Sequence, residues 1–543
     1  MVLKEAYGAI TRPKQTTQIP FNFPVPLKGV NAVSAFSGLL EDEAHYLYNI
    51  LPTEQGLAVR QGFQEYSNDT GYEGRTTITF VGSAAAGTND KIFVTGDDGI
   101  YEMTAGAGNA TKVFTFSTTG TSAGYGVYIQ WTAANGNQYI QYADSANGLI
   151  EYDASGDSWA AVTSITGLTE TDIRFVMVHK LRIWYIVDGD PNAYYLPVSA
   201  KTGAATQFQL GSKFMHGGDC AGLYNMTHDA GDGLDDFFIA ISRDGDVLVY
   251  QGTDPSSAST WGIKGRFQVG AIPTVSRKFG CEVEGDVLIL SSLGLSSVKN
   301  LIQGREEFSV DGRNPTDKIS NTIRNRMMTE LGSSGWEVMV NGSINSVIIQ
   351  TPERQSSPDQ WTHYVYNLAT KAWGSWRGVN SLSMGMLRNV MYFAADDGAV
   401  WYMNGYEDNV TIADAANDSR PVDFSMLTAY SNGGYPGAEK RGGIVKPIFQ
   451  GTGLVDTDSA ILYDYNFIEL SAVGVDGTFD EESVWDTAEW DTAIWGGNTT
   501  YRGLEGTLGD GMGVVFGVAI RGKTRGKLTL MELPCTFEPG GMM

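Results

Sequence analysis

The sequence from residue 231 to residue 301 reads GDGLDDFFIAISRDGDVLVYQGTDPSSASTWGIKGRFQVGAIPTVSRKFGCEVEGDVLILSSLGLSSVKNL. Its first part has an apolar run at 237–242, then Asp244 and Gly245, then a second apolar run at 247–250. This order predicts a β-hairpin, because glycine readily adopts the positive φ that a tight turn needs.

The second part of the same stretch repeats the pattern after a connection that carries Trp261. Two further apolar runs, at 286–291 and 295–301, flank a turn at Gly294. Within about seventy residues, the chain therefore twice specifies a strand, a turn, a second strand and a long connection.

Hairpins of this kind recur along most of the chain. Further copies lie at 91–103, 139–152, 181–196, 347–367 and 391–403. The seven first strands start near residues 91, 139, 181, 237, 286, 347 and 391, so successive starts are 42 to 61 residues apart. A β unit that repeats every 40 to 50 residues or so is typical of propeller blades. One small sheet leaves its apolar faces exposed, and stacking the sheets buries those faces.

The sequence therefore predicts an all-β protein built around a β-propeller of six to eight blades. We expect three regions: an extended arm and lead-in segment at 1–75, the propeller at 76–405, and a C-terminal β domain at 406–543. An inserted helix interrupts the blade series.

Bulk composition restricts the possible functions. The chain has 543 residues, 42% of them apolar, with 67 glycines and a net charge of −25. The glycine and aromatic content favours many short strands and turns. Proteins that wrap DNA or dock on anionic lipid need a cationic surface, so the acidic balance argues against both functions.

Targeting and redox signals are weak. Cys220, Cys281 and Cys535 lack metal-ligand spacing, and we expect them to be reduced core residues. The N-terminus shows no apolar core of a signal peptide, and no apolar run approaches a membrane span in length. We expect a soluble protein made in a cytoplasm, without a membrane span.

The two ends of the chain differ from the blade series. Prolines at positions 13, 20, 24 and 26 make residues 1–35 an extended arm that lies on this chain or on a neighbour. Residues 39–51 could form a short helix that ends at Pro52. Beyond the propeller, strands are predicted at 424–430, 444–449, 460–465, 513–520 and 527–532.

One helix is predicted between blades. Asn314 and Pro315 provide a cap and a first position, apolar residues follow every fourth position from Ile319 to Leu331, and Gly332 stops the pattern. The polar face of this helix carries three basic residues, Lys318, Arg324 and Arg326. This basic patch is either a solvated face or a contact between subunits.

The segment WDTAEWDTAIWGG places Trp485, Trp490 and Trp495 five residues apart. That spacing fits neither one helix face nor one strand face, so an irregular loop is expected. The indoles either pack into a crevice of the same or an adjacent subunit, or form a stacking platform for glycan.

No motif carries catalytic chemistry. The sequence lacks a nucleophile elbow, a P-loop and zinc-ligand spacing, and its acidic turns do not continue into a calcium-loop pattern. We therefore expect no catalytic, cofactor or metal site, and a protein that is not an enzyme. Two aromatic pairs with a common spacing, Tyr152 with Trp159 and Tyr366 with Trp373, are expected to fasten strand ends to their blades.

Three segments together resemble one family of virion proteins. They are NILPTEQGLAVRQGF at 49–63, DDFFIAISRDGDVLVYQGTDPSSASTW at 235–261, and the tryptophan segment at 485–497. Their pattern and order are similar to the tail nozzle or tail-hub proteins of short-tailed bacteriophages. These proteins are also called B-type tail tubular proteins, and packaged-DNA stabilisation proteins are related to them.

The resemblance implies a structural virion protein of the phage tail, made in the host cytoplasm. It implies a hexameric ring that contacts tail adaptor proteins and tail fibres and surrounds a channel for genome retention and ejection. DNA would pass through that channel without specific binding. The alternative is a propeller-type glycan-binding protein or glycoside hydrolase that acts on the host surface.

Overall fold

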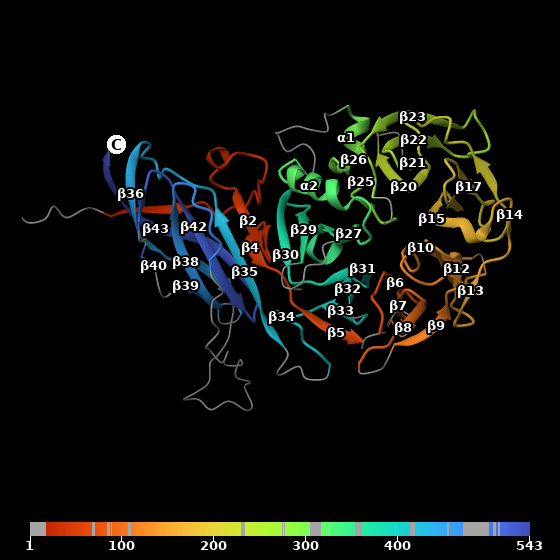
Figure 1. Ribbon diagram of the computed structural model, residues 1–543, viewed down its shortest axis with the longest axis horizontal. Helices are drawn as coiled ribbons and strands as arrows, with labels where there is room; N and C mark the ends of the chain where they lie inside the picture. Colours follow the sequence, from red (N-terminus) through yellow and green to blue (C-terminus); the bar gives the residue numbers. More distant parts are fainter. Residues whose placement is uncertain are drawn as a thin grey trace, which may run out of the picture.

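The computed structural model shows an elongated molecule, with a propeller at one end and a second β domain at the other (Figure 1). It describes residues 18–67, 71–83, 87, 89–106, 110–133, 135–229, 234–273, 275, 277–304, 317–352, 361–396, 398–412, 419–452, 455–470, 499–502, 507–508 and 511–542. Strands account for 54% of the described residues and helices for 6%, which confirms the predicted all-β class.

Small antiparallel sheets arranged around an axis make up the propeller. Six separate sheets of three or four strands are present in the described residues. They are β6–β9 (Thr76–Phe80, Lys91–Thr95, Gly99–Met103, Thr111–Thr115), β10–β13 (Gly126–Thr132, Gln138–Asp144, Gly148–Asp153, Ser158–Ala161), β15–β17 with β19 (Ile173–His179, Arg182–Val187, Ala193–Tyr195, Thr206–Phe208), β20–β23 (Cys220–Asp229, Leu234–Ser242, Asp246–Gly252, Trp261–Gln268), β24–β26 (Gly280–Val283, Asp286–Ser291, Gly294–Ser297), and β31–β33 with β5 (Ser381–Leu387, Val390–Ala395, Val400–Met403, Phe63–Ser67).

A further four-stranded sheet completes the ring between β24 and β31. It consists of β27 Glu337–Asn341, β28 Ser346–Gln350, β29 Thr362–Asn367 and β30 Ala372–Arg377, and it continues into the second domain. The first strands of the sheets neighbour one another in the order β6, β10, β15, β20, β24, β27, β31 and back to β6. The predicted propeller of six to eight blades is confirmed.

The hairpins predicted from the sequence are the second and third strands of each sheet. The run at 237–250, for example, gives β21 and β22, and Gly245 turns between them with φ +90°. One prediction was too long, because residues 298–301 are helical. They belong to α1 (Val298–Ile302), whose first turn is capped by Ser297, which accepts a hydrogen bond from the Asn300 amide.

The second domain combines both ends of the chain. A barrel joins β1–β4 (Ile19–Phe23, Ala44–Tyr48, Ile50–Thr53, Gly56–Val59) to β35–β38 (Arg420–Thr428, Ala438–Val445, Ile448–Gly451, Val455–Tyr463), β42 (Phe516–Thr524) and β43 (Leu528–Met542). Its core contains large apolar side chains such as Phe23, Phe424, Phe449, Leu530 and Phe537, each at most 1% exposed.

The N-terminal arm lies on its own chain over the described part. Strand β1 pairs antiparallel with β43, from Ile19 opposite Phe537 to Phe23 opposite Leu533. The helix predicted at 39–51 was wrong, because residues 44–48 and 50–53 are the strands β2 and β3. The apolar residues there are buried on both faces of a sheet, and a short apolar run does not by itself distinguish such a strand from a helix.

The predicted inserted helix is present but shorter than expected. Helix α2 spans Ser320–Glu330, while Asn314 and Pro315 lie outside the described residues. Ile319, Ile323 and Met327 are buried, as their spacing predicted. The Trp336 indole donates to the Glu330 carbonyl oxygen at 2.9 Å, so the end of α2 is fixed to the residue that precedes β27.

Candidate functional site

Polar side chains from several blades meet at the propeller axis. The Lys278 ammonium lies 2.9 Å from a Glu337 carboxylate oxygen and donates to the Ser383 hydroxyl at 3.5 Å. That hydroxyl accepts a hydrogen bond from the Thr77 amide at 2.9 Å, and Thr77 donates from its own hydroxyl to the Ser383 carbonyl oxygen. The first strands β6, β27 and β31 are thus joined by side chains as well as by packing.

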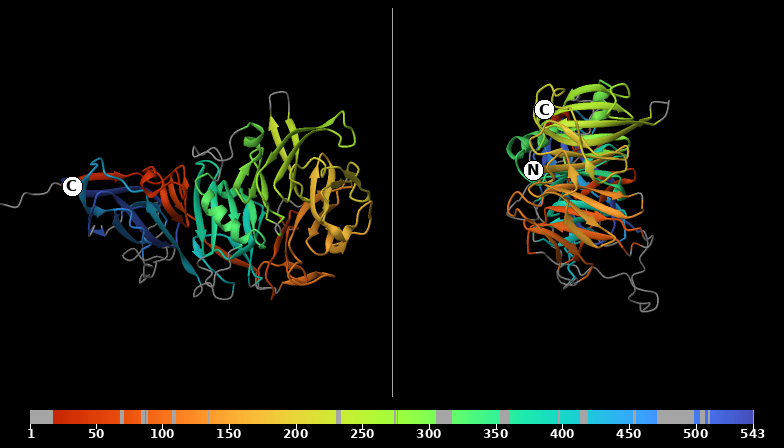
Figure 2. Two further views of the ribbon diagram at one scale, coloured as in Figure 1. Left: turned by 45° about the horizontal axis from the view of Figure 1, so that its top comes forward. Right: turned by 90° about the vertical axis from the view of Figure 1, so that its right-hand side faces the viewer.

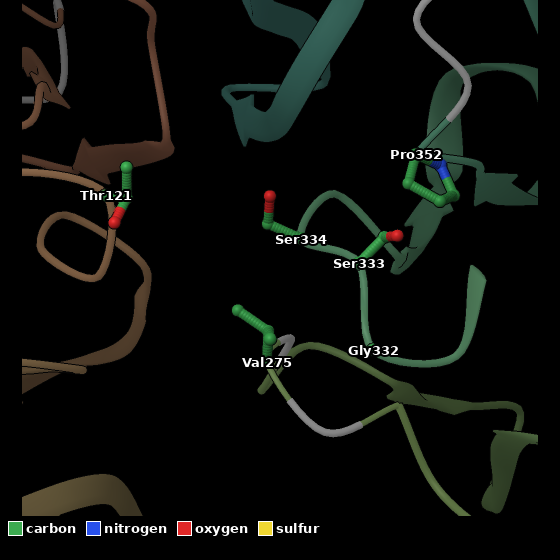
Figure 3. Close-up of a pocket in the computed structure, with 6 residues that line it drawn as sticks. All are labelled: Thr121, Val275, Gly332, Ser333, Ser334 and Pro352. Carbon is green, nitrogen blue, oxygen red and sulfur yellow. The ribbon is translucent and has the colours of Figure 1, made fainter.

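A cavity of about 560 Å³ opens where the connections between blades converge. Its lining residues come from three inter-sheet connections and one hairpin connection, and they are Thr121, Val275, Gly332, Ser333, Ser334 and Pro352. Figure 3 shows Val275 and Ser334 on one side of the open space and Thr121 opposite them. We refer to this space as the axial cavity.

Basic side chains lie in the pocket next to the axial cavity. That pocket has a volume of only about 20 Å³ and is lined in part by Arg75, Arg277, Lys278 and Glu337. Nη1 of Arg75 donates to the carbonyl oxygens of Gly120 at 2.5 Å and Ala123 at 2.7 Å, on the connection that carries Thr121. The two hollows therefore share the same connecting segments.

Arg277 is the most buried of these cations. Its side chain is 9% exposed, and a carboxylate oxygen of Asp188 lies 3.6 Å from Nη2. Burial lowers the pKa of Arg277, and the nearby Arg243 lowers it further. Asp188 and Asp219 act in the opposite direction and raise it, but burial outweighs them at this site.

A second pocket, of about 280 Å³, lies at the junction between the two domains. It is lined by β2, α2, β29 and β30, and its aromatic and basic residues include His45, Tyr48, Arg326 and Arg377. The Arg377 guanidinium lies 3.2 Å from the centre of the Tyr48 ring, and Tyr46 stacks on Tyr48 with centroids 5.0 Å apart. The face of Tyr48 is thus already covered.

The structure places the three predicted basic residues differently from one another. Lys318 precedes α2 and contacts a Glu43 carboxylate oxygen at 3.0 Å and the Lys28 carbonyl oxygen at 3.0 Å. Arg324 is half-buried on α2. Arg326 lines the junction pocket, with its guanidinium 5.8 Å from the centre of the Tyr364 ring. Trp485, Trp490 and Trp495 lie outside the described residues.

Other sequence predictions concern buried or paired groups. The three cysteines are free and buried, as expected, and burial raises the pKa of each thiol. Both aromatic pairs face each other across adjacent strands, with centroids 5.3 Å apart for Tyr152 and Trp159 and 4.9 Å apart for Tyr366 and Trp373. Both indoles are buried, as expected, and their role in fastening the strand ends stays a prediction.

Two classes of site are not found in the described part of the chain. No three His, Cys, Asp or Glu side chains there gather closely enough to hold a metal ion. No helix there combines the length and the apolar character needed to cross a membrane.

The sequence did not identify the axial cations. Arg75 stands directly before β6, and Arg277 and Lys278 stand shortly before β24. A basic residue just ahead of a first strand is a signal that could have been used, but only once the first strands are known. The repeat search detected the second and third strands instead.

Comparisons with known proteins identify no family for this chain. No protein-family model matches the chain, and no curated protein matches it. BamB from Moraxella catarrhalis is 11% identical, with 65% of this chain and 93% of BamB covered and a TM-score of 0.32. YCF48, solved with a D1 peptide, is 12% identical, with 66% and 97% covered and a TM-score of 0.36.

A third solved structure covers more of the chain. The extracellular domain of the hybrid two-component system BT3049 from B. thetaiotaomicron is 11% identical, with 76% of this chain and 55% of that one covered and a TM-score of 0.41. These similarities are loose, and the propeller is established by the order of the sheets in the chain itself.

Proposed function

We propose that this chain is a structural subunit of the tail of a short-tailed bacteriophage, the nozzle or hub ring around the channel for the genome. The resemblance of three ordered segments motivates the proposal. The main structural support is the sheet that is continuous between the two domains. A subunit of a closed ring needs a rigid boundary between its own domains, and such a sheet provides one.

That continuity has a specific basis. Ser375 of the propeller strand β30 pairs with Ile50 of β3 and with Tyr48 of β2, and β2 in turn pairs with β35 of the second domain. One hydrogen-bonded sheet therefore runs from the ring of blades into the barrel (Figures 1 and 2). A shared sheet resists relative domain motion better than a small side-chain interface does.

The net charge of −25 supports a second element of the proposal. Acidic side chains that face a channel repel phosphates and keep DNA from adhering during ejection. A cryo-EM map of the assembled tail checks this element, and a neutral or basic channel wall contradicts it.

Ring assembly is the direct test. The full chain, mixed with its neighbouring tail proteins, is expected to form a closed ring of fixed subunit number in mass photometry and negative-stain images. A chain that stays monomeric with these partners at micromolar concentration contradicts the proposal.

Deleting residues 1–17 removes the arm upstream of β1 and leaves the β1–β43 pairing intact. Lost assembly of this variant, with unchanged thermal unfolding, places a subunit contact in the arm.

The alternative of a glycan-binding or glycan-cleaving propeller has less support from the geometry. The junction pocket is aromatic, but Tyr46 and Arg377 already cover Tyr48 there, and Trp373 is only 1% exposed. Sugar rings need an open aromatic face. A glycan array together with a hydrolysis assay on the full chain tests this alternative.

A further inference from the structure

Arg277 has an unusual environment for a buried guanidinium. Its nearest carboxylate, on Asp188, is 3.6 Å away and itself belongs to a side chain that is 53% exposed. No hydrogen bond from the Arg277 side chain to any described residue is present. Buried guanidinium groups normally use most of their five donors, so this one retains unused donor capacity.

Arg60 of the same chain shows the usual arrangement. Its side chain is 1% exposed, and its guanidinium makes two hydrogen bonds to the Asp408 carboxylate, at 2.7 and 2.6 Å. It also donates to Asn49 at 2.8 Å and to the carbonyl oxygens of Gln61 and Arg377. The difference between Arg60 and Arg277 is therefore a property of the two sites and not of buried arginines in this protein.

Charges of both signs surround Arg277, and the carboxylates of Asp188 and Asp219 raise its pKa. Arg243 and Arg174 lie near enough to lower its pKa. The nearby carboxylates are already engaged, Asp219 with Arg243 at 2.7 Å and Glu337 with Lys278 at 2.9 Å. Among the described residues, Asp188 is therefore the only carboxylate within 4 Å of the Arg277 guanidinium.

Further hydrogen-bond donors lie near the Arg277 guanidinium. The buried Nε atoms of Arg75 and Arg174 have no hydrogen-bond partner among the described residues. The adjacent axial cavity of about 560 Å³ adds the hydroxyl groups of Thr121, Ser333 and Ser334 to its lining. Guanidinium groups together with hydroxyl donors are the groups that bind carboxylate and phosphate oxygens.

We propose that the axial end of the propeller is an oxyanion-binding site, in which a carboxylate or phosphate group lies in the axial cavity and one of its oxygens reaches the Arg277 guanidinium in the adjoining small pocket. Arg75 lies in the same pocket and supplies a second cation. The cavity admits a small ligand or a single side chain, not the backbone of a nucleic-acid duplex. This site goes beyond the proposed tail function and does not depend on ring assembly.

Binding of two probes to the full chain tests the site. Inorganic phosphate and succinate are titrated by calorimetry, and thermal unfolding is followed at increasing probe concentration. A ligand that binds only the folded state raises the unfolding temperature in a saturable way. We expect Arg277→Gln to weaken binding of the preferred probe by about tenfold or more, because a charge-assisted pair is lost. The control Arg266→Gln, on the exposed outer strand β23, is expected to leave binding unchanged.

The unliganded variants separate a binding role from a structural one. If the role of Arg277 is to bind a ligand, Arg277→Gln without any probe unfolds at the wild-type temperature or above it. The substitution removes a buried charge whose carboxylate partner is exposed and 3.6 Å away. A preference for one probe identifies the oxyanion as phosphate or carboxylate. The proposal is overturned if neither probe binds saturably below about 10 mM, the weak end of specific affinities. Equal binding by Arg277→Gln and wild type, or a large loss of stability in the unliganded variant, also overturns it.

Discussion

Phe63 of β5 and Trp401 of β33 pack edge to face, with ring centroids 5.5 Å apart and planes at 90°. Phe63 precedes the first complete blade, and Trp401 belongs to the last one. Their strands pair antiparallel, with Met403 opposite Phe63. The last blade is therefore completed by a strand from before the first, which closes the ring non-covalently.

Removing the Phe63 ring should weaken that closure. Phe63 is 2% exposed and also contacts Phe393, with centroids 5.5 Å apart. We expect Phe63→Ala to lower the free energy of unfolding by about 3 to 5 kcal/mol. Urea unfolding monitored by tryptophan fluorescence measures the effect. The control Leu181→Ala, at a residue that is 62% exposed, should change stability by less than about 0.5 kcal/mol. Equal midpoints for the two variants contradict a role of β5 in closure.

The buried pair of Arg60 and Asp408 joins the lead-in segment to the residues after the propeller. Removing one partner leaves the other charge buried, so Asp408→Asn should destabilise the protein by about 3 to 5 kcal/mol. Lys371 and Glu284 form the matched surface pair, 3.6 Å apart and each more than half exposed. Lys371→Met should therefore cost less than about 1 kcal/mol. Chemical unfolding compares the two, and a similar effect of both substitutions contradicts the prediction.

His45 should make stability depend on pH. Burial lowers the pKa of His45 to about 4 from its ordinary value of 6.5, and its Nε2 atom has no hydrogen-bond partner among the described residues. The folded state therefore binds fewer protons than the unfolded state. The contribution of His45 is fully present above pH 6.5 and is lost as the pH falls toward 4.

Between pH 7.5 and pH 5, we expect His45→Phe to lose about 1 to 2 kcal/mol less stability than the wild-type protein loses. Phenylalanine can preserve the ring contacts that His45 makes with Phe36 and Tyr430. Urea unfolding at the two pH values measures the difference. An identical pH dependence of both proteins means that His45 is protonated without cost in the folded state.

Lys440 should stabilise the second domain through its buried ammonium group. This residue is fully buried, and Nζ donates to the carbonyl oxygens of Tyr435 at 2.6 Å, Ala438 at 2.7 Å and Val514 at 2.7 Å. Lys440→Met leaves three carbonyl groups without this donor, and we expect a loss of about 2 to 4 kcal/mol. The exposed Lys446 provides the control, since Lys446→Met should be nearly neutral. The unfolding temperatures of the two variants are compared with that of the wild-type protein, and equal unfolding temperatures of the two variants contradict the prediction.

The sequence by itself determined the blade hairpins, because their signals are local. Asp244 and Gly245 fix a turn, the flanking runs have strand composition, and both properties lie within about fifteen residues. The buried face of α2 was equally predictable, since Ile319, Ile323 and Met327 repeat at the helical spacing. Local spacing failed at residues 39–51, where a strand buried on both faces also presents continuous apolar residues.

Only the tertiary structure decided which distant segments meet. The pairing of β5 with β33, the sheet that joins β30 to β3, and the gathering of Arg75 and Arg277 at the axis all connect residues far apart in the chain. No local propensity encodes such contacts, because they form only when stacked blades bury one another's apolar faces. The hairpins are therefore determined by neighbouring residues. The closure of the ring and the position of the axial cations depend on the packing of the whole propeller.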